Sequence, residues 1–235
     1  MNKLAVIGIG KMGRNIAKFA KKQGWLVVTF DNRGNKINGI KSANTLNEAV
    51  LGAKIVVLAV SLKNTAIALG ELSPKLNKNQ ILVEITGVKT PFSPNFEKMK
   101  CKVLRLHPLF GEFSDLKAKN MVIVKWKNPR LEKKAKIELQ KLGARVSIMD
   151  VLEHDKIMAE RQLPAYLLGN IFWKMTKGTK KEELTPAMKK MRLLSEEIME
   201  EWLLYESMLR MNPNSGRMLE KIDLEVSKWK RKLKK

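Results

Sequence analysis

The stretch Leu4-Ala5-Val6-Ile7-Gly8-Ile9-Gly10-Lys11-Met12-Gly13 begins with a short apolar run and ends in three glycines spaced Gly-x-Gly-x-x-Gly. The apolar run predicts a buried strand, and the helical periodicity of residues 14–22 predicts a helix directly after the glycines. In this context the first glycine makes the tight turn, the second lets the backbone approach a pyrophosphate, and the third lets the helix lie close to the strand. Free N–H groups at the helix N-terminus favour the same anion. The stretch therefore predicts a dinucleotide-binding turn, with an ordinary glycine turn as the alternative.

Further apolar runs alternate with helical patterns as far as residue 150, and this alternation predicts a doubly wound, mostly parallel Rossmann sheet of the α/β class. The expected strands are residues 25–30, 53–60, 81–85, 102–106, 121–126 and 144–149, and the expected helices between them include 46–51 and 131–142. Beyond this point no β-like run occurs, and helical patterns cover residues 151–177, 187–211 and 217–235. The sequence thus predicts a Rossmann domain over 1–150 and a small all-helical domain over 151–235. The helical domain is too thin for a core of its own, so we expect it to pack on the sheet domain and on a second copy.

Composition limits the classes of function. Lysine and arginine number 46 against 23 acidic residues, which gives a net charge of +23. This charge fits a lysine-rich solvated surface, or attraction for anions such as nucleic acid, phosphates and carboxylates. The lone Cys101 and only two histidines argue against a disulfide, a cysteine zinc site and a His-rich metal site, so no metal is expected. No run is apolar and long enough to span a membrane and no signal peptide is recognised, so a cytoplasmic location is expected.

Asp31 ends the second expected strand, eighteen residues after Gly13. A carboxylate at this position can accept both ribose hydroxyls of an adenosine and would repel a 2′-phosphate, which favours NAD over NADP. Arg33 leaves NADP as an alternative cofactor, because an arginine can pair with that phosphate or stack on the adenine. A plain strand-end turn residue is the alternative for Asp31. The expected cofactor contacts are Gly8, Gly10, Lys11, Met12, Gly13, Asp31, Arg33 and Val60.

Each of the two histidines has a functional and a structural interpretation. His107 follows the fifth expected strand, and the carboxyl ends of parallel strands face the ligand crevice. A neutral imidazole there can accept the proton of a substrate hydroxyl while hydride leaves the same carbon. A loop histidine with a structural hydrogen bond is the alternative. His154, at the start of the first C-terminal helix, belongs either to a capping cluster at the domain junction or to the nicotinamide site.

Taken together, these residues resemble the prephenate/arogenate dehydrogenase family of tyrosine biosynthesis, in a short, archaeal-like, single-function form. The resemblance covers nearly the whole chain. Its parts are the glycine loop, Asp31, Thr86-Gly87-Val88-Lys89, His107-Pro108-Leu109-Phe110-Gly111, His154-Asp155 and Leu163-Pro164. It implies an NAD-dependent oxidoreductase that converts prephenate to 4-hydroxyphenylpyruvate, or arogenate to tyrosine, by hydride transfer to NAD and loss of CO2.

The resemblance also implies roles for individual residues. His107 would accept the proton of the ring hydroxyl, and His154 would be the second catalytic residue. The implied substrate contacts are Thr86, Gly87, Lys89, His107, His154 and, for a substrate carboxylate, Arg192. The chain departs from the family at Gly87, where serine is frequent, and at Ala165, where histidine is frequent, and these departures leave the choice between prephenate and arogenate open.

The thin helical domain and its excess of apolar residues predict a homodimer through the C-terminal helices. These residues include Met199, Trp202, Leu203 and Met208. No membrane partner is expected. The length leaves no room for a chorismate mutase or regulatory domain, so tyrosine feedback through such a module is not expected. Two other functions stay open. Another Rossmann reductase, of the imine or β-hydroxyacid type, shares the loop and layout but does not explain His107-Pro108. A non-catalytic nucleotide- or RNA-binding protein on the same fold would account for the charge of +23 and for Gly87 and Ala165.

Overall fold

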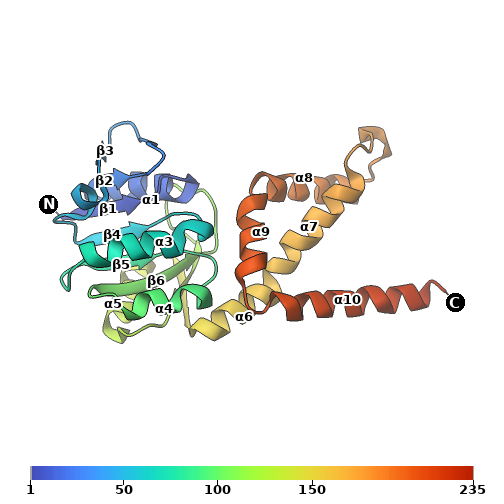
Figure 1. Cartoon of the computed structure of the whole chain (residues 1–235). Helices are drawn as coiled ribbons and strands as arrows, with labels where there is room; N and C mark the ends of the chain where they lie inside the picture. Colours follow the sequence, from blue (N-terminus) through green and yellow to red (C-terminus); the bar gives the residue numbers. More distant parts are fainter. Residues whose placement is uncertain (1, 235) are drawn as a thin grey trace. The chain divides into compact units, whose positions relative to one another are not determined.

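The computed structural model describes residues 2–234 and divides into two compact units, one ending at Val151 and the other beginning at Leu152 (Figure 1). The first unit contains one eight-stranded sheet in the order β3-β2-β1-β4-β5-β6-β7-β8. Its strands are β1 (Lys3–Ile7), β2 (Leu26–Phe30), β3 (Lys41–Ser42), β4 (Ile55–Leu58), β5 (Ile81–Glu84), β6 (Lys102–Pro108), β7 (Asn120–Val124) and β8 (Arg145–Met149). All neighbouring strands are parallel except β6 and β7. The predicted doubly wound, mostly parallel sheet is confirmed.

Helices cover both faces of this sheet. They are α1 (Lys11–Lys22), α2 (Leu46–Val50), α3 (Leu62–Leu72), α4 (Ser93–Glu97) and α5 (Pro129–Lys141). The strand order runs one way from β1 to β3 and the other way from β1 to β8, so right-handed crossovers place α1 and α3 on opposite faces. Phe19 of α1 and Leu139 of α5 pack in the same core cluster, against Val6 and Ile123 of the sheet. The order reverses between β1 and β4, where ligands bind in such sheets.

In the glycine turn between β1 and α1, two of the three glycines have no room for a side chain. Gly8 has a φ of +94°, in the left-handed region, and a Cβ atom built on it would lie 2.7 Å from the carbonyl oxygen of Ala59. A Cβ atom on Gly13 would lie 2.0 Å from the carbonyl oxygen of Gly8. Gly10 is different, because its Cβ atom would meet nothing within 4 Å. Two of the glycines are therefore needed by the fold, and the third leaves open space.

The second unit consists of helices alone. They are α6 (Val151–Arg161), α7 (Leu163–Thr176), α8 (Pro186–Glu200), α9 (Trp202–Met211) and α10 (Ser215–Lys232). Helices α7 and α8 approach closely at Gly169, where a Cβ atom would lie 2.4 Å from Cδ1 of Ile198. Few large apolar side chains are buried in this unit, and many are exposed. Exposed examples are Leu152, Leu168, Met175, Met191, Leu193, Leu203, Leu219, Leu224 and Trp229.

Several elements differ from the expectation. The helical patterns at 151–177 and 187–211 are each divided into two helices. Pro164, in the first turn of α7, has no N–H group to continue the helix from α6, and Glu201 interrupts the second pattern with a φ of −107° and a ψ of 17°. Helix α3 was not among the expected helices, and the glycine in its interior, Gly70, is a poor helix former. Strand β3 is a polar pair too short to give a pattern. Within the residues described, no helix is both long and apolar enough to cross a membrane.

The glycine turn gives a stability prediction. Gly13→Ala should destabilise the chain by roughly 1–3 kcal/mol, because the new methyl group must displace backbone. Gly10→Ala should stay within about 0.5 kcal/mol of the parent, because its methyl group enters open space. Urea unfolding followed by circular dichroism measures both. Equal losses of stability in the two variants would contradict the conclusion that the fold requires glycine at residue 13 but not at residue 10.

Candidate functional site

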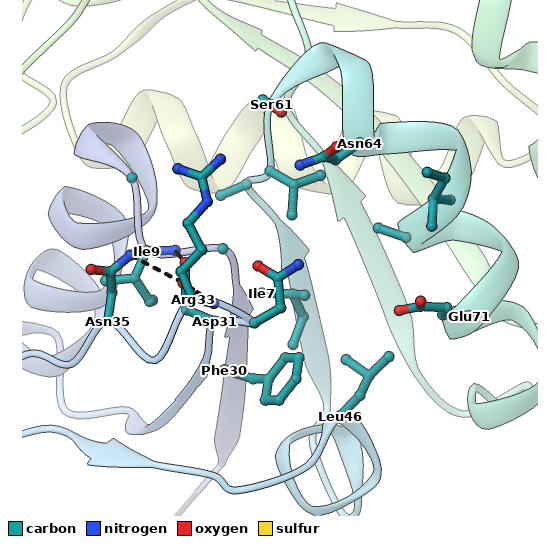
Figure 2. Close-up of a pocket in the computed structure, with 17 residues that line it drawn as sticks. Ile7, Ile9, Phe30, Asp31, Arg33, Asn35, Leu46, Ser61, Asn64 and Glu71 are labelled. Atoms are coloured by element: carbon teal, nitrogen blue, oxygen red, sulfur yellow. Dashed lines mark hydrogen bonds between the residues drawn. The ribbon is translucent and has the colours of Figure 1, made fainter.

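A cavity of about 300 Å³ lies at the point where the strand order reverses, beside the glycine turn. One side is formed by the glycine turn and by the loop after β2, and the other by the end of β4 and by α3. The lining residues named in Figure 2 are Ile7, Ile9, Phe30, Asp31, Arg33, Asn35, Leu46, Ser61, Asn64 and Glu71. Gly8, Gly10 and Val60 also line it. The expected contacts Lys11, Met12 and Gly13 do not line the cavity but form the first turn of α1.

Asp31 ties the two sides of the glycine turn together. Its Oδ2 atom accepts a hydrogen bond of 2.7 Å from the backbone N–H of Ile9. Its Oδ1 atom accepts bonds of 2.9 Å from the backbone N–H of Arg33 and 3.0 Å from the side-chain amide of Asn35. Partial burial would raise the pKa of Asp31, but these hydrogen bonds outweigh it and hold the pKa below its ordinary value. The carboxylate is ionised at neutral pH and remains at the cavity wall.

Arg33, Asn64 and Glu71 give the cavity a polar rim. Figure 2 shows Arg33 extending from the loop after β2, with Asn64 and Glu71 on the opposite side. The expected Arg33 and Val60 are thus present, and Ser61, Asn64 and Glu71 were not foreseen. Ser61 could have been found, because it follows β4 and serves as the N-cap of α3. Asn64 and Glu71 lie on a helix that was not expected.

His107 lies on the same edge of the sheet but outside this cavity. Strand β6 continues past β5, whose last residue Glu84 pairs with Arg105, so His107 lies two residues beyond that pair. On its other side His107 pairs with Val122 of β7. The side chain is 5% exposed. Three strand spacings separate β1 from β6, about 14 Å, so the glycine turn and His107 lie at separate points of one edge.

Next to His107 lies a buried ionic cluster that the sequence did not reveal. Glu84, Lys89 and Arg105 each have 0% of the residue exposed. Lys89 Nζ lies 2.9 Å from Glu84 Oε1, and Arg105 Nε lies 3.2 Å from Glu84 Oε2. The backbone N–H of Thr86 also donates to Glu84, at 2.6 Å, and the Thr86 hydroxyl contacts the same carboxylate. Thr86 and Lys89 were expected to contact substrate, and the structure holds both side chains in this cluster.

The charge state of Glu84 follows from its partners. Complete burial would raise the pKa of Glu84, but Lys89 and Arg105, together with the hydrogen bond from Thr86, outweigh it and lower the pKa. Glu84 is therefore ionised at neutral pH. Arg105 also packs its guanidinium over the rings of Phe96, at 4.7 Å, and Trp126, at 5.1 Å.

His154 and Arg192 belong to the second unit, and their contacts are known within that unit. His154 and Asp155 are completely buried, with His154 Nδ1 2.8 Å from Asp155 Oδ1. Asn212 donates a hydrogen bond of 2.8 Å to the carbonyl oxygen of Asp155. Arg192 donates to Glu196 at 3.2 Å and to the carbonyl oxygen of Thr179 at 3.0 Å. Both expected residues therefore have local partners on their own helices or on the neighbouring segment.

Residues 2–234 contain no group of three or more His, Cys, Asp or Glu side chains that could hold a metal ion. The polar groups of the cavity are instead suited to an organic ligand with hydroxyl and anionic groups. Asp31 offers carboxylate oxygens, and the first turn of α1 has no side-chain cap on its N–H groups.

Residues 3–101 match the family model described as the NAD binding domain of 6-phosphogluconate dehydrogenase. A curated relative is a probable arogenate/prephenate dehydrogenase of Methanocaldococcus jannaschii, 27% identical over 164 residues, or 64% of this chain and 37% of the relative. Another is a T-protein of Haemophilus influenzae, 26% identical over 161 residues, or 67% of this chain and 41% of the relative. The chain thus spans about two fifths of the length of these relatives.

Among solved structures, the chain is similar to prephenate dehydrogenase from Aquifex aeolicus in complex with hydroxyphenyl propionate and NAD+. The TM-score is 0.80 at 13% sequence identity, covering 98% of this chain and 90% of that chain. The match therefore extends over both units in fold. The resemblance to prephenate and arogenate dehydrogenases is confirmed, and within the first unit residues 3–101 match an NAD-binding domain.

Glu84→Gln tests the buried ionic cluster. At pH 7 the variant should lose roughly 3–5 kcal/mol of stability, because Lys89 and Arg105 lose their buried counter-charge. The pKa of Glu84 in the folded chain is below its ordinary value of 4.5, so the unfolded chain takes up this proton first as the pH falls. The contribution of Glu84 to the free energy of unfolding is therefore fully present above pH 4.5. It is lost as the pH falls through the lower pKa of the folded chain.

The difference in free energy of unfolding between the parent and Glu84→Gln should therefore shrink below pH 4.5. Urea unfolding across an acidic pH series measures this difference. Glu132→Gln is the matched control. It removes another buried carboxylate of the same unit, which accepts a backbone hydrogen bond from Trp126. A difference for Glu84→Gln that stays constant down to the lowest pH would exclude the assigned ion pairs.

Proposed function

We propose that this chain is an NAD-dependent oxidoreductase that oxidises and decarboxylates prephenate or arogenate. The observation that carries the proposal is the shared sheet edge, with a cavity at the glycine turn and a buried imidazole, His107, at the end of β6. The family match of residues 3–101 and the likeness in fold to the Aquifex aeolicus enzyme support it. The redox cofactor and a proton acceptor are the two groups that this reaction requires.

The cavity fits NAD. Gly10 leaves open space where a side chain would stand, and the N-terminus of α1 can bind the pyrophosphate there. Asp31 has carboxylate oxygens for ribose hydroxyls and a negative charge that disfavours a 2′-phosphate, so NAD is preferred to NADP. Arg33 would lie against the adenosine half. When bound, NAD supplies the hydride acceptor.

The chain's own contribution to the chemistry is one proton acceptor and an oriented substrate. His107 accepts the proton of the ring hydroxyl as that carbon gives up its hydride, and loss of CO2 makes the ring aromatic. Because aromatisation drives the reaction, orientation accounts for most of what the protein must supply. The segment Thr86–Gly87, which follows β5, is assigned to the substrate side.

Arg192 is assigned to a substrate carboxylate. Its guanidinium is shared with Glu196 and Thr179, so its side chain is already held in a defined direction. The net charge of +23 favours the approach of dianionic prephenate and of the cofactor.

His107→Asn tests the proton acceptor. We expect kcat to fall by about 10²–10⁴-fold, the usual contribution of a positioned general base. NAD affinity should stay within twofold, because His107 does not line the cavity at the glycine turn. Reduced nicotinamide absorbance measures turnover, and tryptophan fluorescence measures NAD binding.

The same assay is run with prephenate and arogenate and with NAD and NADP. Turnover of the parent with neither substrate, or full activity in His107→Asn, would overturn the proposed function. Imine and β-hydroxyacid substrates, run in parallel, identify a different reductase. Salt-dependent RNA binding without turnover identifies a nucleic-acid protein.

We also propose that the chain is a homodimer through its second unit. An apolar groove lies between α7 and α10, lined by Leu168, Ile222, Val226 and Trp229, and Trp229 is 60% exposed. Such exposed apolar surface marks an interface rather than a solvated face.

Trp229→Glu should therefore shift the chain towards monomer in light scattering at micromolar concentration, because it places a charge in the apolar groove. Lys230→Glu is the control, since it adds the same carboxylate on the next residue outside the groove. A monodisperse monomer for the parent chain would contradict the dimer.

A further inference from the structure

We propose that Lys89 is a positioning residue for His107, holding the end of β6 and the segment after β5 in one fixed arrangement through the carbonyl group of Leu106. The inference rests on the proposed function, in which His107 accepts the substrate proton. Lys89 was expected to contact substrate directly, but it is completely buried. Its effect on the reaction must therefore pass through the residues that it touches.

The ammonium of Lys89 has a precise position in the fold. Its Nζ atom donates a hydrogen bond of 2.6 Å to the carbonyl oxygen of Leu106, the residue before His107. The same atom lies 2.9 Å from Glu84 Oε1. Glu84 is the last residue of β5, and its pair on β6 is Arg105, so β5 provides no paired residue beside Leu106. Lys89 supplies a donor to β6 at the point where the neighbouring strand has ended.

Lys89 is also held by its main chain. Its carbonyl oxygen accepts a hydrogen bond of 2.5 Å from Nη2 of Arg105. Nη1 of the same guanidinium donates to the hydroxyl of Ser93, at 2.9 Å. Both ends of Lys89 are thus bound to β6, its side chain through Leu106 and its backbone through Arg105.

These bonds enclose the segment assigned to the substrate side. The segment runs from Glu84 through Thr86 and Gly87 to Lys89, and Glu84 and Lys89 are its fixed ends. Within it, the Thr86 hydroxyl lies 2.7 Å from the carbonyl oxygen of Val88. The substrate segment and the strand that carries His107 therefore form one body, held by three buried charged side chains.

A buried ionic cluster is not the arrangement that stabilises a core most. Apolar side chains of similar volume often serve stability as well or better, whereas removal of one partner leaves a buried charge uncompensated. The cluster contributes conformational specificity, because the hydrogen bonds of Glu84, Lys89 and Arg105 fix one arrangement of the segment after β5 and the end of β6. A proton acceptor needs such an arrangement, since a misplacement of about 1 Å can cost a large part of the rate.

The test uses the two histidines of the chain, His107 and His154. Protein labelled with ¹⁵N in histidine gives ring-nitrogen signals from two imidazoles only, and those absent from His107→Asn are assigned to His107. Lys89→Met should move the His107 signal and leave that of His154 in place. In the same variant kcat should fall roughly 10–100-fold, the loss expected from a misplaced catalytic group, with NAD affinity within twofold.

Two further variants control for folding. Lys125→Met makes the same substitution at an exposed ion pair, with Asp150, and should change neither signal nor kcat. If Lys89→Met does not fold, Lys89→Gln offers Glu84 an uncharged donor and leaves Arg105 with its counter-charge. Its side chain is shorter than that of the lysine whose ammonium bonds to Leu106, so it should again move the His107 signal.

The outcomes separate the two proposals. A folded Lys89→Met variant with an unchanged His107 signal and kcat within twofold of the parent overturns the positioning role and leaves a structural one. A parent chain without turnover on prephenate or arogenate overturns the proposed function. In that case the His107 signal still decides whether Lys89 positions the imidazole.

Discussion

The contact between the backbone of Gly13 and the carbonyl oxygen of Gly8 is the constraint on which the first unit depends. At 2.0 Å from that oxygen there is no room for a Cβ atom, so helix α1 can lie against β1 only if residue 13 is glycine. The close approach fixes the direction of α1 and so aims its N-terminal N–H groups at the cavity. The same turn places Ile9 N–H against Asp31, which connects β1 to the end of β2.

Local patterns in the sequence predicted most of the first unit and several of the residues that line the cavity at the glycine turn. The glycine turn, Asp31 and Arg33 could be found because each follows a buried strand within a few residues. The ionic cluster could not be found, since Glu84 and Arg105 are 21 residues apart and meet only through the register of β5 and β6. Lys89 was assigned to the substrate through the family resemblance, and its burial beside Glu84 is a property of the tertiary structure that no local pattern shows.

The helical unit was less well predicted. Periodicity alone joins α6 to α7 and α8 to α9, because an amphipathic pattern can continue in register across a short break. The close packing of Gly169 on Ile198 brings α7 against α8, while much of the apolar surface of the unit stays outside that contact. This exposed apolar surface is the observation on which the proposed dimer rests. The His154–Asp155 pair of this unit is completely buried in the chain.

The hydrogen bond from Ile9 to Asp31 has a consequence for redesign. A protein engineer who wished to switch this chain to a phosphorylated cofactor would begin by replacing Asp31 with a small neutral residue. That change would also remove the acceptor for Ile9, and the three bonds that anchor the carboxylate would be lost with it. Under the proposed function, the coenzyme preference and the conformation of the glycine turn both depend on this one side chain. A redesign must therefore supply another acceptor for the Ile9 N–H together with the new specificity.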